Sequence, residues 1–459
     1  MSIPLEPDAS TRARLTEQVA EFIEEWFAQT PSMDASAPGL SDEQVASLLS
    51  APGADGRPLA DILADLEMAG QGGILHPSGG HMSYIPNGGL FTSALAEHLA
   101  AALNRYTGVT AAAPGMTAIE TGVTRWIASI FGFEEPASCI LLSGGSTANL
   151  TGIVAARVDR LGERFDDGTL YLTRHTHHSV AKAARIAGFR NDQIRLVDVN
   201  AGLEMDLEHL RHLVSQDAAA GLRPFLVAPS AGTTDTGTVD DLSAVADVAD
   251  EHGLWMHTDA AYGGFFYLTG RGRDTLGGIE RSDSIALDPH KGLSIPFGVG
   301  ALVVADEKHL IDANYGRGAY LQHEEVYQGL RDISTLGPEL TRPFRGLGVW
   351  LPLQLHGVEP FREALDASLD LAAHAYERIR HLEGVRPLWA PDLSIVAFGF
   401  EDDDVGRRAL EAVNDDRSTH LSPTEIDGRF ILRLAILNRR TTAEDVDHAI
   451  DLIEKTLIG

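Results

Sequence analysis

A lysine that follows a proline directly after an apolar run stands out in Ser282-Asp-Ser-Ile-Ala-Leu-Asp-Pro-His-Lys291. Pro289 lacks the N–H group that a central strand needs, so the chain must leave the predicted sheet there. Lys291 is thereby predicted just beyond the end of a strand, where a rigid scaffold can strip water from its amino group and make it a nucleophile. An ordinary loop lysine fits the same segment, so the rest of the chain has to decide.

Other predicted strands also end in residues that could do chemistry. Ser143-Gly-Gly-Ser-Thr-Ala-Asn149 leads into a helix, and its glycines and helix start offer backbone N–H groups to a phosphate. Arg174–Ser179 contains three histidines but no carboxylate at ligand spacing, so a stacking imidazole fits as well as a metal ligand. Asp259 ends a buried strand, where a carboxylate is costly unless a cation or donor pairs with it. The turn Gly232–Gly237 adds hydroxyl groups.

An anion cradle, a buried aspartate, an imidazole and a lysine thus follow different strands. Pyridoxal phosphate requires this set: a phosphate site, a carboxylate for its ring nitrogen, a stacking partner and a lysine that forms a Schiff base. Each signal alone is weak, because glycine–serine turns before helices and loop lysines are common. Together they predict a site for pyridoxal 5'-phosphate and no metal site.

The elements that must position these groups alternate between short apolar runs and helices from about residue 110 to 305. The predicted strands are Ser138–Leu142, Leu170–Thr173, Ile194–Val197, Pro224–Ala228, Leu254–Asp259, Ser284–Leu287 and Val299–Ala305. Helices such as Asp206–Gln216 and Asp241–His252 separate them, which is typical of an α/β fold with a mostly parallel sheet covered on both faces. Ligands bind beyond the carboxyl ends of such strands, where the residues above are found.

Three parts of the chain are predicted: a helical arm (1–75), a large domain (76–345) and a smaller C-terminal α+β domain (346–459). In the arm, Ser41-Asp-Glu-Gln44 has the pattern of a capping box, and the apolar residues suit packing on another part of the protein or on a partner subunit. Strands Ile395–Phe400 and Phe430–Leu434, and a final helix capped by Thr441-Thr-Ala-Glu444, are predicted in the C-terminal part. Residues 312–345 are predicted to form a long loop.

Composition limits the partners. The net charge of −30 over 459 residues argues against nucleic acid or an anionic membrane. No apolar run approaches the length of a membrane span, and the N-terminus lacks a basic-then-apolar signal, so a cytoplasmic protein is predicted. The single cysteine, Cys139, excludes an intramolecular disulfide and a multi-cysteine metal site, and its apolar neighbours predict an unreactive thiol.

As an ordered set, these motifs resemble the group II pyridoxal-phosphate-dependent amino acid decarboxylases, which include aromatic-amino-acid, glutamate, histidine and tyrosine enzymes. The motifs that carry the resemblance are Ser143–Asn149, His177-His-Ser-Val180, Gly232-Thr-Thr234, His257-Thr-Asp-Ala-Ala-Tyr262, Asp288-Pro-His-Lys291 and Glu339–Arg345. The resemblance implies the aspartate-aminotransferase fold (fold type I) and an obligate homodimer. In that dimer the active sites lie at the subunit boundary and the N-terminal helices wrap the partner.

The resemblance also assigns roles to residues. It implies that Lys291 forms the internal aldimine and that Asp259 binds the pyridine nitrogen. His177 would stack on one face of the ring and Ala261 would contact the other, with Thr234 near the Asp259 side. Gly145, Ser146 and His290 would hold the phosphate, and Tyr320 would support protonation of the substrate Cα after carbon dioxide has left.

These roles predict decarboxylation of an L-amino acid to an amine, with an aromatic substrate slightly favoured. Family members that oxidise the intermediate to an aldehyde tend to lack the tyrosine or the histidine, whereas Tyr320 and His177 are both present here. Gly292 replaces a tryptophan found in many relatives, and His76-Pro is followed by Ser-Gly-Gly-His-Met instead of aromatic residues, which removes apolar bulk.

A polar substrate contacted by His81, Tyr84 and Asn87 therefore stays open, since these residues occur in a glycine-rich loop that could form a ligand wall or an ordinary surface loop. An oxidative aldehyde synthase, an aminotransferase and a non-catalytic scaffold stay open as well. An aminotransferase would use an arginine on a strand of the small domain to bind the substrate carboxylate. Arg433 occupies such a position, and we interpret it as structural.

Overall fold

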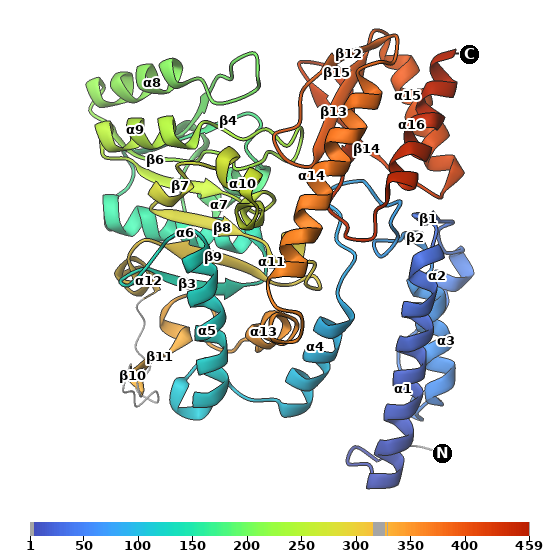
Figure 1. Cartoon of the computed structure of the whole chain (residues 1–459). Helices are drawn as coiled ribbons and strands as arrows, with labels where there is room; N and C mark the ends of the chain where they lie inside the picture. Colours follow the sequence, from blue (N-terminus) through green and yellow to red (C-terminus); the bar gives the residue numbers. More distant parts are fainter. Residues whose placement is uncertain (1–3, 315–325, 328, 459) are drawn as a thin grey trace.

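A seven-stranded sheet forms the centre of the computed structural model, which describes residues 4–314, 326–327 and 329–458 (Figure 1). In spatial order its strands are β3 (Ser138–Leu142), β9 (Gly300–Val304), β8 (Ser284–Leu287), β7 (Trp255–Asp259), β6 (Arg223–Val227), β4 (Gly168–Thr173) and β5 (Ile194–Val197). Strand β9 runs antiparallel to both neighbours, and the other pairs are parallel. The predicted mostly parallel sheet of seven strands is confirmed, with strand ends that differ by at most two residues.

Helices cover both faces of this sheet. One face packs against α5 (Pro114–Ile130), α8 (Leu207–Ala219) and α9 (Leu242–His252), and the other against α6 (Gly145–Leu161), α7 (His178–Ile186) and α12 (Glu307–Asn314). Side chains alternate accordingly along β4: Tyr171 joins the first core, and Leu170 and Leu172 join the second. Asp241 caps α9, one residue before the helix begins, and Gly253 follows its last residue with φ +66°.

A second, antiparallel sheet lies in the C-terminal part of the chain. Its order is β12 (Val385–Leu388), β13 (Ile395–Phe400), β15 (Arg429–Ala435) and β14 (Ser422–Ile426), and helices α14 (Glu359–Ile379), α15 (Asp403–Asp416) and α16 (Ala443–Ile458) pack with it. The sequence did not predict β12 and β14, because each edge strand contains a proline, Pro387 or Pro423, that argues against a strand. Helix α13 (Gly346–His356) packs instead on α5 and on α4 (Phe91–Leu103).

The cap of the last helix differs from the prediction by one residue. Thr442 Oγ1 accepts from the N–H of Asp445 at 3.3 Å, and the Asp445 carboxylate accepts from the N–H of Thr442 at 2.8 Å. The capping pair is therefore Thr442 and Asp445 instead of Thr441 and Glu444. Thr441 is used elsewhere, since its hydroxyl donates to the carbonyl of Gly79 at 2.6 Å.

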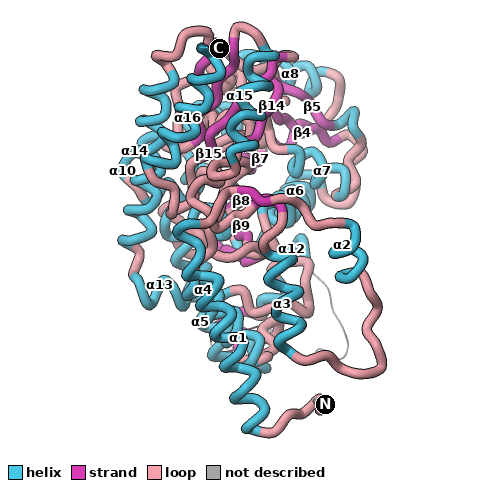
Figure 2. Tube along the Cα trace, turned by 90° about the vertical axis from the view of Figure 1, so that its right-hand side faces the viewer, coloured by secondary structure: helices cyan, strands magenta, loops and turns pink. Residues whose placement is uncertain are grey.

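The N-terminal arm consists of α1 (Ala9–Gln29), α2 (Asp42–Leu48) and α3 (Leu59–Gly70), and the described chain buries no residue of these helices. The capping box of α2 is confirmed: Ser41 N–H donates to Gln44 Oε1 at 2.8 Å, and Gln44 N–H to Ser41 Oγ at 3.2 Å. Strands β1 (Ser36–Ala37) and β2 (Gly73–Ile74) pair at the base of the arm. The two chain termini lie at opposite ends of the molecule (Figure 1 and Figure 2).

The predicted long loop at 312–345 is only partly irregular. Within its described part, α12 continues to Asn314, β10 (Val326–Tyr327) pairs with β11 (Leu330–Arg331), and a short 3₁₀ turn covers Ile333–Thr335. Tyr320 lies outside the described residues. Among the described helices, none combines the length and the apolar character needed to cross a lipid bilayer.

Candidate active site

The predicted lysine lies beyond the carboxyl end of β8, as the proline requires. Pro289 begins α11 (Pro289–Gly292), a single turn that also carries His290 and Lys291. The Lys291 side chain is 22% exposed, so it is partly accessible from the site. The same edge of the sheet holds Asp259 at the end of β7 and Gly145 at the start of α6.

The start of α6 forms a close cradle. A Cβ atom on Gly145 would lie 3.0 Å from Ala261 Cβ and 3.0 Å from Asp288 Oδ2, and one on Gly144 would lie 3.4 Å from His290 Cε1. Only glycine leaves this space open. The first N–H groups of a helix lack partners within it, so this turn, which includes Ser146, suits a phosphate.

Asp259 is 6% exposed and accepts hydrogen bonds from two neutral donors. Its Oδ1 atom accepts from the N–H of Ala261 at 3.1 Å, and its Oδ2 atom accepts from Asn149 Nδ2 at 3.1 Å. A protonated ring nitrogen would provide a positively charged partner for this buried carboxylate. The sequence singled out Asp259, and Asn149 was noted only as the end of a motif.

His177 lies at the N-terminal cap of α7, and its Nδ1 atom is 2.7 Å from Ser179 Oγ. Burial lowers the pKa of His177, and the carboxylate of Asp259 opposes that shift. A neutral imidazole, suited to stacking on an aromatic ring, is therefore favoured at neutral pH.

Asp288, which the sequence singled out only as the first residue of a motif, lies beside His290 and Lys291. Its side chain is 3% exposed, with Oδ2 at 2.8 Å from Lys291 Nζ and 3.6 Å from His290 Nε2. Its Oδ1 atom has no hydrogen-bond partner among the described residues. The signal was available, since Asp288 follows a buried strand directly, as Asp259 does. Burial lowers the pKa of His290, whose Nδ1 atom bonds the carbonyl of Val299 at 2.7 Å.

The three residues predicted for substrate contact have different environments. His81 is fully buried, its ring centroid lies 4.7 Å from that of His76, and burial lowers its pKa to about 3. Asn87 is 3% exposed and donates its amide to the carbonyls of His290 and Ile295. Tyr84 is 57% exposed. Of the three, only the side chain of Tyr84 has substantial exposure.

Arg433 ties the remaining predicted residue, Thr234, to the loop and to the small sheet. It donates to the carbonyl of Thr234, to the carbonyl of Tyr84 at 3.1 Å and to Ser422 Oγ at 2.8 Å. Arg433 is 3% exposed and its guanidinium donates to protein acceptors, which favours the structural interpretation.

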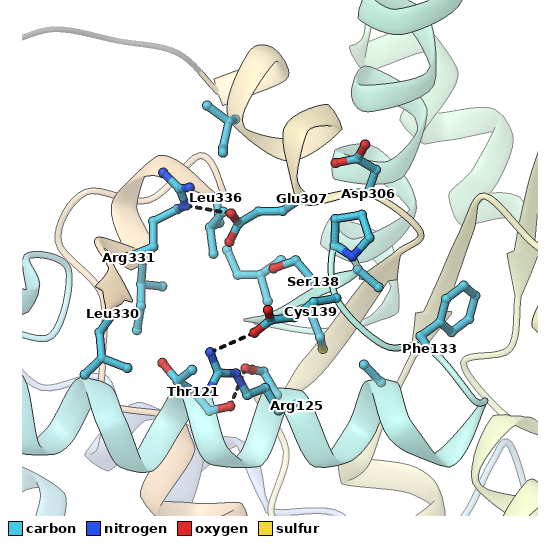
Figure 3. Close-up of a pocket in the computed structure, with 18 of the residues that line it drawn as sticks. Thr121, Arg125, Phe133, Ser138, Cys139, Asp306, Glu307, Leu330, Arg331 and Leu336 are labelled. Carbon is cyan, nitrogen blue, oxygen red and sulfur yellow. Dashed lines mark hydrogen bonds and ion pairs between the residues drawn. The ribbon is translucent and has the colours of Figure 1, made fainter. Parts of the chain in front are cut away.

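A cavity of about 900 Å³ lies at the opposite end of the sheet, between α5, the start of β3 and β11 (Figure 3). Its walls carry ion pairs between Arg331 and Glu307 at 2.7 Å and between Arg125 and Glu135 at 3.4 Å. None of the described residues predicted for the site lines it.

Comparison with known proteins identifies the family. Residues 49–400 match the profile described as the pyridoxal-dependent decarboxylase conserved domain. The chain belongs to this family. It is 30% identical over 375 residues to an aromatic-L-amino-acid decarboxylase of Bacillus atrophaeus, which covers 80% of this chain and 78% of that protein. It is 31% identical over 297 residues to human cysteine sulfinic acid decarboxylase, covering 63% of this chain and 60% of that protein.

The decarboxylase also superposes on the crystal structure of Oryza sativa TDC with PLP and tryptamine. The TM-score is 0.92 at 25% sequence identity, and the match covers 100% of this chain and 99% of that one. The predicted family, fold type I architecture and cofactor are confirmed: the chain is a pyridoxal-phosphate-dependent amino acid decarboxylase. The glycine cradle and the buried Asp259 fit that cofactor.

Proposed function

We propose that this decarboxylase acts on an aromatic L-amino acid and releases carbon dioxide and the amine without oxidation. The observation that carries the substrate class is the packing at the positions where the sequence departs from aromatic-specific relatives. The loss of large apolar side chains at these positions would favour a polar substrate only if it left open space in the pocket. The glycines that occupy these positions pack against other residues and leave no such space.

Gly292 is buried against the protein interior. A Cβ atom on Gly292 would lie 2.7 Å from the Cβ of Phe265, which is 1% exposed. A Cβ on Gly79 would lie 2.6 Å from the carbonyl oxygen of Arg440, and one on Gly80 would overlap the carbonyl of Ser418. These glycines allow close packing inside the chain, so they do not widen the substrate pocket.

The polar side chains of the loop also give little support to a polar substrate. The ring of His81 has no exposed surface, and the Nδ2 atom of Asn87 donates to two backbone carbonyls while its oxygen accepts from the N–H of Gly89. Tyr84, the exposed member, is itself aromatic. An aromatic side chain is therefore the better match.

Pyridoxal phosphate, when bound, supplies a conjugated ring that takes up the negative charge left at Cα as carbon dioxide departs. In our proposal, Lys291 holds the cofactor and Asp259 keeps a proton on its ring nitrogen. Gly145, Ser146 and His290 hold the phosphate, while His177 and Ala261 contact opposite faces of the ring. Thr234 lies near the Asp259 side. Tyr320 is included through the family resemblance as the group that supports protonation of Cα.

A screen of the common amino acids for carbon dioxide release tests this proposal, with peroxide, ammonia and new amino acids measured in parallel. We expect an aromatic amino acid to give equal amounts of carbon dioxide and amine. Peroxide with aldehyde would show an oxidative enzyme, and a new amino acid formed from a keto acid without carbon dioxide would show an aminotransferase. Turnover restricted to an acidic or other polar amino acid would reject the aromatic substrate.

We also propose a homodimer, because α2 and α3 carry apolar side chains that their own chain leaves exposed. Leu48 is 42% exposed and Leu66 is 54% exposed. Sedimentation of the full chain should give about twice the mass of 49.3 kDa, and a monomer at micromolar concentration would contradict the proposal. The three-part domain division and the cytoplasmic location stay predictions.

A further inference from the structure

A series of buried polar side chains leads from the protein interior to Asp259. Trp255 Nε1 donates to Ser284 Oγ at 2.8 Å, and this oxygen lies 2.7 Å from His257 Nδ1. His257 Nε2 lies 3.0 Å from Asn149 Oδ1, and Asn149 Nδ2 donates to Asp259 Oδ2 at 3.1 Å. The first four of these residues have no exposed surface, so the hydrogen bonds are shielded from water.

The carboxylate fixes the direction of every bond in this series. An ionised carboxylate only accepts, so Asn149 must turn its NH₂ group to Asp259 and its oxygen to His257. His257 must then carry its proton on Nε2, which leaves Nδ1 to accept from the hydroxyl of Ser284. Burial lowers the pKa of His257 to about 4, which agrees with a neutral ring at physiological pH.

Asn149 also has a second branch. Its Nδ2 atom donates to Ser179 Oγ at 2.9 Å, and that oxygen lies 2.7 Å from His177 Nδ1. The hydrogen of Ser179 Oγ is available to His177 Nδ1, and the backbone N–H of Ser179, which can only donate, bonds the same nitrogen at 3.4 Å. A neutral His177 must therefore carry its proton on Nε2.

The backbone of α6 is adapted to this network. A Cβ atom on Gly152 would lie 2.6 Å from Cε1 and 2.7 Å from Nδ1 of His257. Gly152 therefore lets the imidazole lie directly against the helix that carries Asn149, three residues earlier in the chain. This close approach is independent of the hydrogen bonds and supports the same arrangement.

We infer that Asn149 is a positioning residue that couples the two groups on either branch: it orients the carboxylate of Asp259 toward the cofactor's ring nitrogen and fixes His177 with its proton on Nε2. The inference rests on the proposed roles of Asp259 and His177 at the cofactor. It explains why an amide stands at this position, since only a group with an acceptor and two donors can satisfy His257, Asp259 and Ser179 together.

Cofactor affinity tests the Asp259 branch without turnover. The full-length apoprotein is titrated with pyridoxal phosphate and with its 1-deaza analogue, which has CH in place of the ring nitrogen. Asn149→Leu is expected to weaken binding of pyridoxal phosphate roughly tenfold or more and binding of the analogue less than about threefold. Equal weakening of both ligands, or no weakening, would overturn the inference.

Gln193→Leu is the matched control. Gln193 is 3% exposed and its amide donates to the carbonyls of Phe165 and Gly168, away from the site. Loss of this buried amide should leave the ratio of the two affinities unchanged. A change in that ratio would mean that general loss of stability, not the contact with Asp259, produces the effect of Asn149→Leu.

The His177 branch is tested by ring ¹⁵N chemical shifts in protein labelled with ¹⁵N-histidine, where the signal of His177 is the one lost in His177→Asn. In the wild type at pH 8 we expect a bare Nδ1 and a protonated Nε2. Ser179→Ala removes the hydroxyl of this branch and leaves His177 Nδ1 only the longer bond from the backbone N–H at 3.4 Å, so it should give a mixture of tautomers and leave the affinity ratio at the wild-type value. A wild-type signal with the proton on Nδ1, or no effect of Ser179→Ala, would reject the coupling.

Neither measurement depends on turnover. A wild type that releases no carbon dioxide would contradict the proposed function and leave the tautomer and affinity results intact. An active wild type without the affinity difference would contradict the role of Asn149 alone.

Discussion

Along β7 and β8, buried polar side chains lead in one direction to Asp259 at the carboxyl end of β7, and Asp288, which follows β8, retains an oxygen without a partner among the described residues. At the opposite end of the same sheet, the cavity between α5 and β11 is lined by charges that pair with each other, such as Arg331 with Glu307 (Figure 3). Both ends are rich in polar groups. They differ in whether those groups still have capacity to bind something else.

This difference indicates that volume is a poor guide to the active site here. The cavity at the paired end measures about 900 Å³, yet its charges neutralise one another at short range. The cofactor end has a glycine cradle, a lysine and a buried carboxylate whose hydrogen bonds come from neutral donors. A ligand site needs buried polar groups that are held in place by their neighbours and can still form a hydrogen bond or an ion pair with the ligand.

The largest expected effect is a difference between two lysine substitutions, one at Lys291 beyond β8 and one at Lys308 beside the cavity. Lys291→Ala should abolish borohydride-stable attachment of the cofactor and lower the rate of carbon dioxide release at least about a thousandfold, because it removes the amino group that we propose holds the cofactor. Lys308→Ala, at the cavity, should retain the attachment of the cofactor and the rate of carbon dioxide release. The chain has four lysines, so peptide mass mapping of the reduced adduct identifies the modified residue. An adduct on Lys308, or full activity of Lys291→Ala, would reverse the comparison.

The positions of the proposed cofactor residues relative to the strands could be predicted because the signals in the sequence are local. A proline after a strand, glycines before a helix and an aspartate at a strand end each act through the backbone of a few residues. They located Lys291, Gly145 and Asp259 at the carboxyl ends of the strands without knowledge of the strand order.

Features that depend on contacts between distant segments were missed. Asn149 bonds Asp259 from 110 residues away, and no spacing rule connects them. Gly292 was interpreted as missing bulk beside the substrate, whereas its contact with Phe265 depends on how α11 packs. The cavity at the opposite end of the sheet was not predicted either, because it forms where α5, β11 and the start of β3 meet.

The buried ion pair at the cavity end gives the next largest effect. Arg342 Nη1 lies 2.5 Å from Glu120 Oε1, and both side chains are 1% exposed. Glu120→Gln would leave the guanidinium buried without its counter-charge and should lower the free energy of unfolding by about 3–5 kcal/mol, measured in urea. The affinity for pyridoxal phosphate should change less than about threefold.

Glu135→Gln provides the matched control, because it breaks the exposed pair with Arg125 on the wall of the same cavity. That change should lower the free energy of unfolding by less than about 1 kcal/mol. A loss of cofactor affinity in parallel with stability in Glu120→Gln would mean that the two ends of the sheet are not independent.

Acid sensitivity should be concentrated near the cofactor end, where His81 is buried and neither ring nitrogen has a hydrogen-bond partner among the described residues. Its folded-state pKa of about 3 lies below the ordinary value of 6.5, so the unfolded chain binds the proton first as the pH falls. The stability due to the neutral ring is complete above pH 6.5 and declines below it. Between pH 7.5 and 5 the wild type should lose about 2 kcal/mol more than His81→Leu.

Met82→Leu is the control for this pH dependence, since Met82 is fully buried beside His81 and does not titrate. The free energy of unfolding of Met82→Leu should decrease as the pH is lowered, by the same amount as that of the wild type. Parallel curves for wild type and His81→Leu would show that the acid-sensitive group lies elsewhere.

The smallest expected effect concerns Cys139, which lines the cavity between α5 and β11 (Figure 3). Burial, together with the nearby carboxylate of Glu120, raises the pKa of the thiol, so little thiolate is present at pH 8. Iodoacetamide should modify the native protein at least roughly a hundredfold more slowly than the urea-unfolded chain, and Cys139→Ala should cost about 1 kcal/mol without loss of activity. Rapid modification of the native thiol would show that this cavity also holds a reactive group, and the contrast between the two ends would then rest on ion pairing alone.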